Sequence, residues 1–403
     1  SALRTWTGLG YGEYWFPEIR SLQGAVAMMS LVLYPYVYLL ARAAFLSQSL
    51  CVLEVSRTLG NGPWRTFLSV ALPLARPGIV AGLSLALMEA LADYGTVQYF
   101  GVSTFTTGIF RTWFGLDNTA AAAQLSAVLL GFVLVLVAME RLSRRSALYH
   151  HTSQRHQAIR RYPLRGHKAG AAVTFCLVPL ALGFMLPAGQ LAFWTVTIAD
   201  GSVDATFLRL LWNSLKLAAA ASLLALVFAL FFAYGRRVFR GRAVSLSVTA
   251  AGMGYAVPGT VIAVGVIIPF AWFDNRLDAW TRATFDWSTG LLLSGTLVAL
   301  MFAYLVRFLA VSLQTVEAGL AKIRPSMDEA ARSMGHGPMR VLQRVHVPML
   351  RGALLTALLL VFVDVLKELP ATLILRPFNF NTLAVRAYEL ASDERLADSA
   401  PAG

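Results

Sequence analysis

Eight long apolar stretches restrict what this chain can fold into. A helix needs about 20 residues to cross the ~30 Å hydrocarbon core of a bilayer, because it rises ~1.5 Å per residue. Only 14% of the residues are charged, well below the roughly one quarter found in soluble domains. The stretches lie at about 22–41, 77–99, 119–139, 170–197, 208–234, 244–272, 289–310 and 352–375. The sequence therefore predicts an all-α polytopic membrane protein with about eight transmembrane helices and no sizeable soluble domain.

Basic residues gather in alternate connecting segments. The basic segments are 42–76, 141–168, 235–243 and 311–351, and the neutral or acidic ones are 100–118, 198–207, 273–288 and 376–403. This alternation is typical of the positive-inside rule, so the basic segments are expected to be cytoplasmic and the others periplasmic. It also accounts for the net charge of +13 without a nucleic-acid partner. The expected surroundings are membrane lipid.

A polar segment occurs twice, 275 residues apart. Residues 54–65 read EVSRTLGNGPWR, and residues 329–340 read EAARSMGHGPMR. Fifteen of the 58 positions from Glu54 to Arg111 are identical at this one offset. Packing between apolar helices would not by itself repeat polar residues broken by glycine. The repeat therefore indicates a duplicated functional loop within a duplicated architecture.

Each copy predicts an elbow of two short helices along the inner membrane face. Gly60 and Gly335 can take the left-handed conformation that ends a helix, and Pro63 and Pro338 favour the first position of the next helix. A second break is expected at Pro73 and Pro348, just before the following span. An exposed elbow of this kind is a docking surface.

The second copy resembles the signature loop of ABC-type importer permeases. Glu329-Ala330-Ala331, Gly335, Val345, Val347 and Pro348 match its spacing. The first copy matches at Glu54, Gly60, Val70, Leu72 and Pro73, and departs where Val55-Ser56 replaces the alanine pair. In that family the loop forms a coupling helix seated in a cleft of the cytoplasmic ATPase. The resemblance implies ATPase contacts at Glu54, Arg57, Gly60, Gly62, Glu329, Ala330, Arg332, Gly335 and Gly337.

Four further stretches resemble the fused permeases of ferric-iron importers. They are residues 14–20, 254–260, 367–377 and 383–390. This resemblance implies a type I permease fold in a bacterial inner membrane, a periplasmic binding protein, and two cytoplasmic ATPase subunits that carry ATP and Mg²⁺. The chain itself has no Gly-x-x-x-x-Gly-Lys-Ser/Thr loop, so we expect it to bind no nucleotide and no other cofactor.

Other functions remain open from the sequence alone. Fused permeases for thiamine, spermidine or putrescine, and phosphonate share much of the pattern. An ion-coupled secondary carrier would leave the two matching elbows unexplained. A membrane enzyme would need a polar catalytic cluster, and no catalytic residue is predicted. Iron import is the favoured function.

Four carboxylates lie in or beside apolar spans, where ionisable groups are costly and often functional. Glu89 and Asp93 are four residues apart and share a helix face, and the 275-residue offset aligns them with Asp364 and Glu368. They could line one substrate pathway for a hard cation, with Tyr94 and Tyr99 adding phenolic oxygens. Alternatively they pair with Lys367 and neighbouring cations and hold helices together. No firm metal site follows.

Segment 141–168 separates two unequal copies of a helical unit. We expect a first half at 1–140 with the last three helices of its unit, a basic linker at 141–168, and a second half at 169–403 with the first five. Six spans per half would make this chain a piece of a longer protein. The linker holds four of the six histidines, His150, His151, His156 and His167, among eight cations and no carboxylate, so we interpret it as a solvated linker rather than a metal site. Gly254, Pro258 and Gly259 indicate either close helix packing or a broken helix at the translocation route, and we favour packing with a local kink.

Overall fold

The computed structural model describes residues 8, 18–145, 163–197, 204–239 and 241–403. Every regular element among these residues is a helix, and there is no strand among them. Eight helices are long and apolar enough to cross a membrane. They are Leu22–Leu46, Pro63–Ala92, Thr119–Leu142, His167–Thr197, Ala205–Val238, Gly259–Phe285, Leu297–Leu320 and Pro338–Leu366. The predicted all-α polytopic fold with eight spans is confirmed.

The elements before the linker run from α2 to α8. They are α2 (Leu22–Leu46), α3 (Leu50–Thr58), α4 (Pro63–Thr66), the π-helical turn η1 (Phe67–Ala71), α5 (Leu72–Ala92), α6 (Gly95–Tyr99), α7 (Phe105–Phe110), the π-helical turn η2 (Arg111–Gly115) and α8 (Thr119–Arg145).

The elements after the linker run from α9 to α20. They are α9 (His167–Leu180), the π-helical turn η3 (Ala181–Met185), α10 (Leu186–Thr197), α11 (Ala205–Val238), α12 (Arg242–Ala251), the 3-10 turn η4 (Gly254–Ala256), α13 (Gly259–Phe285), α14 (Leu297–Leu320), α15 (Pro325–Ser333), α16 (Pro338–Val341), the π-helical turn η5 (Leu342–His346), α17 (Val347–Leu366), α18 (Pro370–Leu375), α19 (Leu383–Ser392) and α20 (Leu396–Ser399).

The 275-residue repeat of the sequence recurs in the helix boundaries. The pairs α3 and α15, α4 and α16, and η1 and η5 begin and end 275 residues apart, and α2 and α14 begin 275 residues apart. The two copies therefore share one local architecture. Their division at 141–168 stays a prediction, because residues 146–162 of the linker, including His150, His151 and His156, lie outside the described residues.

Small residues let the long helices approach closely. A Cβ at Gly78 would lie 2.6 Å from the Ala44 Cβ, and one at Gly82 would lie 2.7 Å from the Val37 Cα, so a Gly-x-x-x-Gly face of α5 packs on α2. In the second copy Gly319 of α14 approaches Ala353 of α17 in the same manner, with 2.8 Å between the built Cβ and the Ala353 Cβ.

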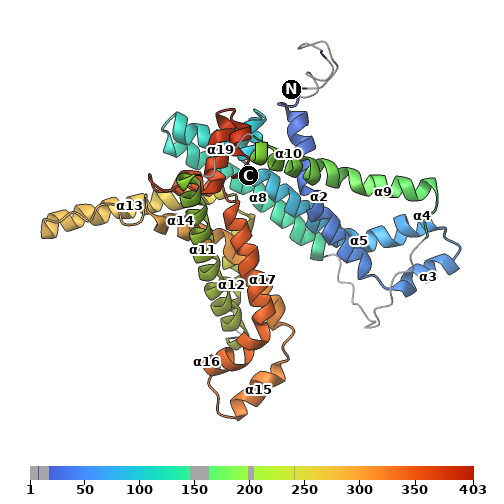
Figure 1. Cartoon of the computed structure of the whole chain (residues 1–403). Coiled ribbons are helices and arrows are strands. Elements are labelled where there is room, and N and C mark those ends of the chain that lie inside the picture. Colours follow the sequence, from blue (N-terminus) through green and yellow to red (C-terminus); the bar gives the residue numbers. More distant parts are fainter. Residues whose placement is uncertain (1–7, 9–17, 146–162, 198–203, 240) are drawn as a thin grey trace.

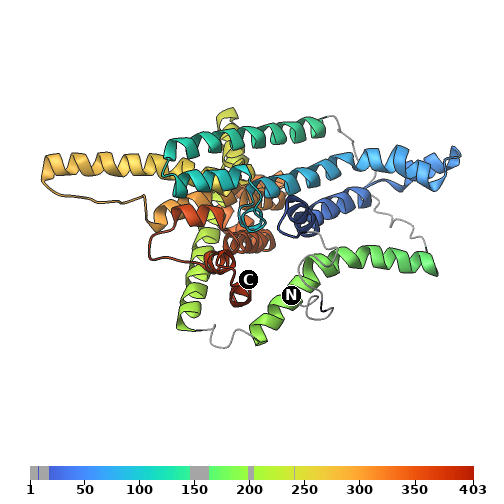
Figure 2. The same ribbon diagram turned by 90° about the horizontal axis from the view of Figure 1, so that it is seen from above.

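Two groups of long helices diverge from a shared region. Figure 1 shows α11, α14 and α17 in one group and α2, α5 and α8 in the other, meeting near α8 and α19. The contact between α8 and α13 joins the groups. Figure 2 shows α13 extending away from the shared region. Each elbow, α3–α4 and α15–α16, lies at the far end of its group (Figure 1).

Three predicted spans end or break earlier than hydropathy suggested. The span predicted at 77–99 stops at Ala92, and the span predicted at 352–375 stops at Leu366, because each chain turns there into a new short helix, α6 or α18. The span predicted at 244–272 is interrupted between α12 and α13, with Pro258 in an extended conformation as the N-cap of α13. Gly254 does pack closely, against the Val306 carbonyl oxygen, but the helix is broken rather than merely kinked.

The predicted periplasmic loop at 273–288 is mostly helical, because α13 continues to Phe285. Two of its carboxylates, Asp274 and Asp278, have partners within the fold and so do not mark a loop. Asp278 pairs with Arg282 one turn later, at 2.8 Å. Asp274 is fully buried and accepts hydrogen bonds from the backbone N–H groups of Leu293 and Ser294.

The break predicted at Pro73 and Pro348 is wrong. A π-helical turn precedes each proline, and the helix continues from α4 through η1 into α5, and from α16 through η5 into α17. Within η1 the Leu72 N–H bonds to the Phe67 carbonyl, five residues back. The wider turn accommodates the following proline, which has no N–H to donate. The second arm of each elbow is therefore the start of a membrane-spanning helix.

Candidate functional site

The two elbows share one backbone motif. The Gly60 N–H bonds to the Arg57 carbonyl at 2.9 Å, and the Asn61 N–H bonds to the Ser56 carbonyl at 3.2 Å. The same pair of bonds joins residues 335 to 332 and 336 to 331, at 2.9 and 3.1 Å. This is a Schellman motif, which needs a left-handed residue after the helix. Gly60 has φ +83° and Gly335 has φ +77°, so the predicted helix-ending glycines are confirmed.

Each elbow closes through a buried pair of side chains at equivalent positions. In the first elbow the hydroxyls of Ser56 and Thr66 lie 3.2 Å apart, and Asn61 donates to Ser56. In the second elbow the equivalent positions are Ala331 and Val341, each 2% exposed. One elbow is thus closed by hydrogen bonds and the other by apolar contact.

Large apolar side chains project from both elbows at equivalent positions, a feature that the sequence reasoning missed. Leu59 and Trp64 are 76% and 78% exposed, and their counterparts Met334 and Met339 are 68% and 64% exposed. Exposed apolar groups on a polar segment that is predicted to be cytoplasmic are typical of a protein contact. A comparison of the two copies at the 275-residue offset could have identified these positions, because each carries a large apolar residue in both copies. Glu54, Glu329, Ala330 and Arg332 are exposed beside them.

The second elbow is also tied to α11 by charged groups. Arg237 donates from Nε to Asp328 Oδ2 at 2.7 Å and from its other nitrogens to the carbonyls of Leu320 and Ile323. The fully buried His346 places Nε2 at 2.7 Å from Asp328 Oδ1. At the 275-residue offset, Leu53 and Ala71 replace Asp328 and His346, so the first elbow cannot form this contact.

Asp328→Asn should loosen α15 selectively. Arg237 and Asp328 are 17% and 16% exposed, so leaving one of them without its partner costs about 1–3 kcal/mol. Amide exchange across residues 325–333 should therefore accelerate by about tenfold. Exchange across residues 50–58 should not change. Glu317→Gln is the matched control, because its pair with Arg236 is exposed and worth only about 0.2–1 kcal/mol. Equal acceleration in the control, measured by hydrogen exchange, would contradict this role for Asp328.

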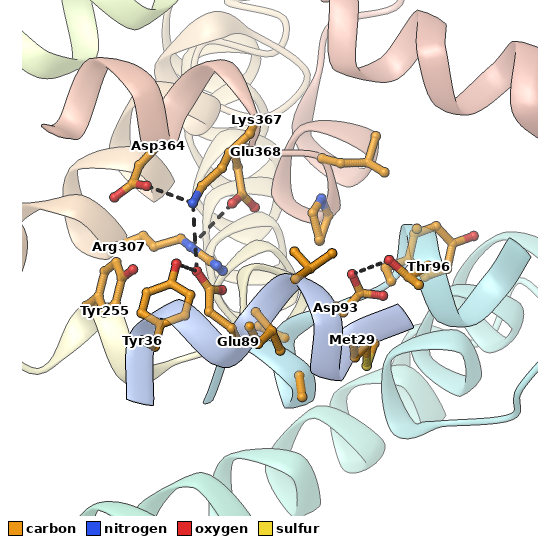
Figure 3. Close-up of a pocket in the computed structure, with 18 of the residues that line it drawn as sticks. Met29, Tyr36, Glu89, Asp93, Thr96, Tyr255, Arg307, Asp364, Lys367 and Glu368 are labelled. Atoms are coloured by element: carbon orange, nitrogen blue, oxygen red, sulfur yellow. Dashed lines mark hydrogen bonds and ion pairs between the residues drawn. The ribbon is translucent and has the colours of Figure 1, made fainter. Parts of the chain in front are cut away.

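The predicted carboxylates meet in one cavity of about 390 Å³ between the two helix groups. The lining residues come from α2, from the α5–α6 turn, from η4 and α14, and from the α17–α18 turn. Glu89, Asp93, Asp364 and Glu368 all line it, with Arg307 and Lys367 as its two cations. The formal net charge of the lining is therefore −2. Figure 3 shows Glu89, Asp364 and Glu368 gathered around Lys367 and Arg307, with Asp93 apart from them beside Thr96.

Two cations form ion pairs with three of the four carboxylates. Lys367 Nζ lies 3.0 Å from Asp364 Oδ1 and 3.8 Å from Glu89 Oε1. Glu89 also accepts a hydrogen bond from the Tyr36 hydroxyl, at 3.3 Å. Arg307 Nε lies 3.3 Å from Glu368 Oε2, and both side chains are buried. Arg307 lies within the span predicted at 289–310 and near the middle of α14, so the rule that singled out the carboxylates could have found it too.

Asp93 and Glu368 hold the starts of the short helices that follow the spans. Asp93 accepts from the Val97 N–H at 3.1 Å and from the Thr96 hydroxyl at 3.0 Å. Glu368 accepts from the Ala371 N–H at 3.1 Å. Both carboxylates therefore stabilise helix N-termini, α6 in one copy and α18 in the other. This favours a structural contribution from these two and leaves Glu89 and Asp364 as the candidates for the substrate pathway.

Tyr94 joins the two helix groups rather than offering a free phenol. Its hydroxyl lies 2.9 Å from the Tyr388 hydroxyl, and its ring stacks on Phe110. Tyr99, by contrast, lies beneath the Arg20 guanidinium and does not line the cavity. Among the described residues no group of three or more metal-ligating side chains comes together. His167 begins α9.

Comparisons with known proteins agree with this geometry. Residues 15–148 match a family model described as "Binding-protein-dependent transport system inner membrane component". The chain is 25% identical to the Fe(3+)-transport system permease protein FbpB 2 of Haemophilus influenzae, over 98% of this chain and 75% of that protein. It is 24% identical to the ferric transport system permease protein FbpB of Actinobacillus pleuropneumoniae, over 80% of this chain and 47% of that one.

A shorter relative is named for a different substrate. The molybdenum transport system permease protein ModB of Haemophilus influenzae is 29% identical over 33% of this chain and 56% of its own length. The chain thus spans three quarters of the first relative and about half of the other two. The family match over residues 15–148, the ferric relatives along most of the chain and the eight apolar helices indicate a multi-pass inner-membrane protein that resembles the ABC importer permease FbpB.

Proposed function

We propose that this permease imports ferric iron. A periplasmic binding protein delivers the substrate to the outer face, and two ABC ATPase subunits dock on the elbows at Glu54 and Glu329. ATP hydrolysis, with Mg²⁺, takes place on those partners and drives alternating access. The ferric relatives support iron as the substrate, and the two equivalent elbows support two equivalent ATPase contacts.

The cavity between the helix groups carries the proposal. Its four carboxylates outnumber its two cations, and carboxylate oxygens are ligands that suit hard cations. An oxyanion or a phosphonate would meet net repulsion in the same place. The charge of the lining therefore argues against the molybdenum-type and phosphonate alternatives.

The elbows lie on the helices that reach this cavity. The α4–η1–α5 helix leads from Gly62 to Glu89, and the α16–η5–α17 helix leads from Gly337 to Asp364. A movement imposed on either elbow would be passed along one continuous helix to a cavity carboxylate. This connection supports ATP-driven transport over an ion-coupled secondary carrier.

An organic cation is the second candidate. The rings of Tyr36, Tyr255 and Phe308 also line the cavity, and aromatic faces attract cations such as thiamine or a polyamine. Iron is preferred because the relatives that align with most of the chain are ferric permeases.

Reconstituted transport tests the proposal. The full-length permease, its ATPase and its binding protein are placed in proteoliposomes, and uptake of radioactive ferric iron is followed. We expect accumulation that requires both ATP and the binding protein, and that excess thiamine, spermidine or molybdate leaves unchanged. Accumulation of thiamine or spermidine without iron would reassign the substrate, and uptake driven by an ion gradient without ATP would refute the mechanism.

A further inference from the structure

Lys367 places a tethered ammonium group between carboxylates of the two helix groups. It is the C-cap of α17, and its Nζ contacts Asp364 of the same helix and Glu89 of α5. Its side chain is 55% exposed. Figure 3 shows it reaching into the cavity toward both carboxylates.

The cations of the cavity break the symmetry of the repeat. The 275-residue offset pairs each carboxylate of one copy with a carboxylate of the other, but it pairs Lys367 with Ala92 and Arg307 with Val32. Both cations therefore come from the second copy. A repeat with a purely structural role would not require both cations to come from the same copy.

Arg307 and Lys367 differ in their freedom to move. Arg307 is 8% exposed and pairs with Glu368, and a Cβ at Gly259 would clash with both side chains. Lys367 stands half-exposed on a flexible four-carbon stem. Of the two cations in the lining, Lys367 is the one that can leave its partners.

We propose that Lys367 is a built-in counter-ion, which holds the cation position between Glu89 and Asp364 while the cavity is empty and gives way to the incoming cation. This inference rests on the proposed import of a cation. Without the ammonium group, Glu89 and Asp364 would face each other across the helix groups as unpaired like charges.

The tether also makes Lys367 a determinant of specificity. A linked group competes at an effective concentration in the millimolar range or higher. A free monovalent ion offers the carboxylates no more charge than the ammonium group already does. An ion of higher charge offers more, so the lysine selects multivalent cations against the Na⁺ and K⁺ of the surroundings.

Terbium(III), a hard trivalent ion with luminescence sensitised by nearby tyrosines, is the probe. It is titrated into the full-length permease assembled with its ATPase in lipid nanodiscs. Lys367→Met should bind Tb³⁺ about tenfold or more tightly than the unmodified protein, and Lys367→Arg should bind it as weakly as the unmodified protein. Lys216→Met is the matched control, because Lys216 lies over the Trp212 ring of α11, outside the cavity lining, and should not change the affinity.

A second measurement needs no variant. Tb³⁺ should raise the rate at which Lys367 of the unmodified protein is acylated, read by mass spectrometry, because displacement frees the amine from its partners. Equal Tb³⁺ affinity in Lys367→Met, or acylation of Lys367 that Tb³⁺ leaves unchanged, would overturn the counter-ion role while the cation pathway stands. Absence of Tb³⁺ binding in every form would overturn the pathway as well.

Discussion

Replacing Gly60 and Gly335 together by valine should abolish uptake while the permease still folds and inserts. Both glycines have positive φ angles, a conformation that costs an ordinary residue about 1–2 kcal/mol and a β-branched residue more. A Cβ at either position would meet no atom within 4 Å, so crowding does not contribute. Strain would instead open the Schellman motif and move α3 and α15 relative to the spans. The measurement is uptake per assembled permease.

A graded control separates conformation from side-chain size. Asparagine enters the left-handed region far more readily than valine, so the double change to asparagine should retain most of the uptake. If the valine double variant transports normally, or if valine and asparagine impair uptake equally, the geometry of the elbows is not what couples them to the ATPase.

Glu89→Gln should lower iron uptake by about tenfold or more per folded complex, with little loss of stability. Glu89 faces the cavity and shares Lys367 with Asp364, so the change removes a ligand charge from the route. The elbow is untouched, and ATPase binding should persist.

Asp93→Ala is the matched change at the neighbouring carboxylate. Because Asp93 accepts the Val97 N–H at the start of α6, its loss should cost about 0.5–2 kcal/mol of stability and reduce the amount of folded protein more than uptake per molecule. Thermal unfolding and uptake per folded complex are measured on both variants. Normal uptake per complex in Glu89→Gln would leave the pathway without support and shift the preference to an organic substrate.

The local features of this fold could be predicted from the sequence. Hydropathy predicted the number of spans and their approximate positions, since a bilayer sets their length and composition. The helix-ending glycines and the prolines that start the next helix were also predicted correctly, because a left-handed turn and a fixed φ are properties of single residues. Repetition of these residues at one offset indicated the second elbow as soon as the first was identified.

Contacts between distant segments could not be predicted in the same way. The approach of Lys367 to Glu89, and of Arg237 to Asp328, depends on how whole helices pack. Where a prediction from single residues was wrong, a neighbouring segment had changed the local structure. A π-helical turn lets the helix pass Pro73, and backbone donors at Leu293 and Ser294 let a helix keep the buried Asp274. Charged residues of the predicted loop at 273–288, such as Asp274, therefore belong to α13.

The most direct measurement is disulfide or thiol cross-linking of the two elbows to the ATPase in native membranes. The exposed Cys51 and Cys176 are first changed to serine. Single cysteines are then placed at Trp64, at its counterpart Met339, and at Asn118 in a predicted periplasmic segment. We expect both elbow cysteines to form a permease–ATPase product, and Asn118 to form none but to react with an impermeant reagent from outside. If neither elbow cross-links, or if Asn118 cross-links while the elbows are labelled from outside, the two segments are not the ATPase contacts of this permease.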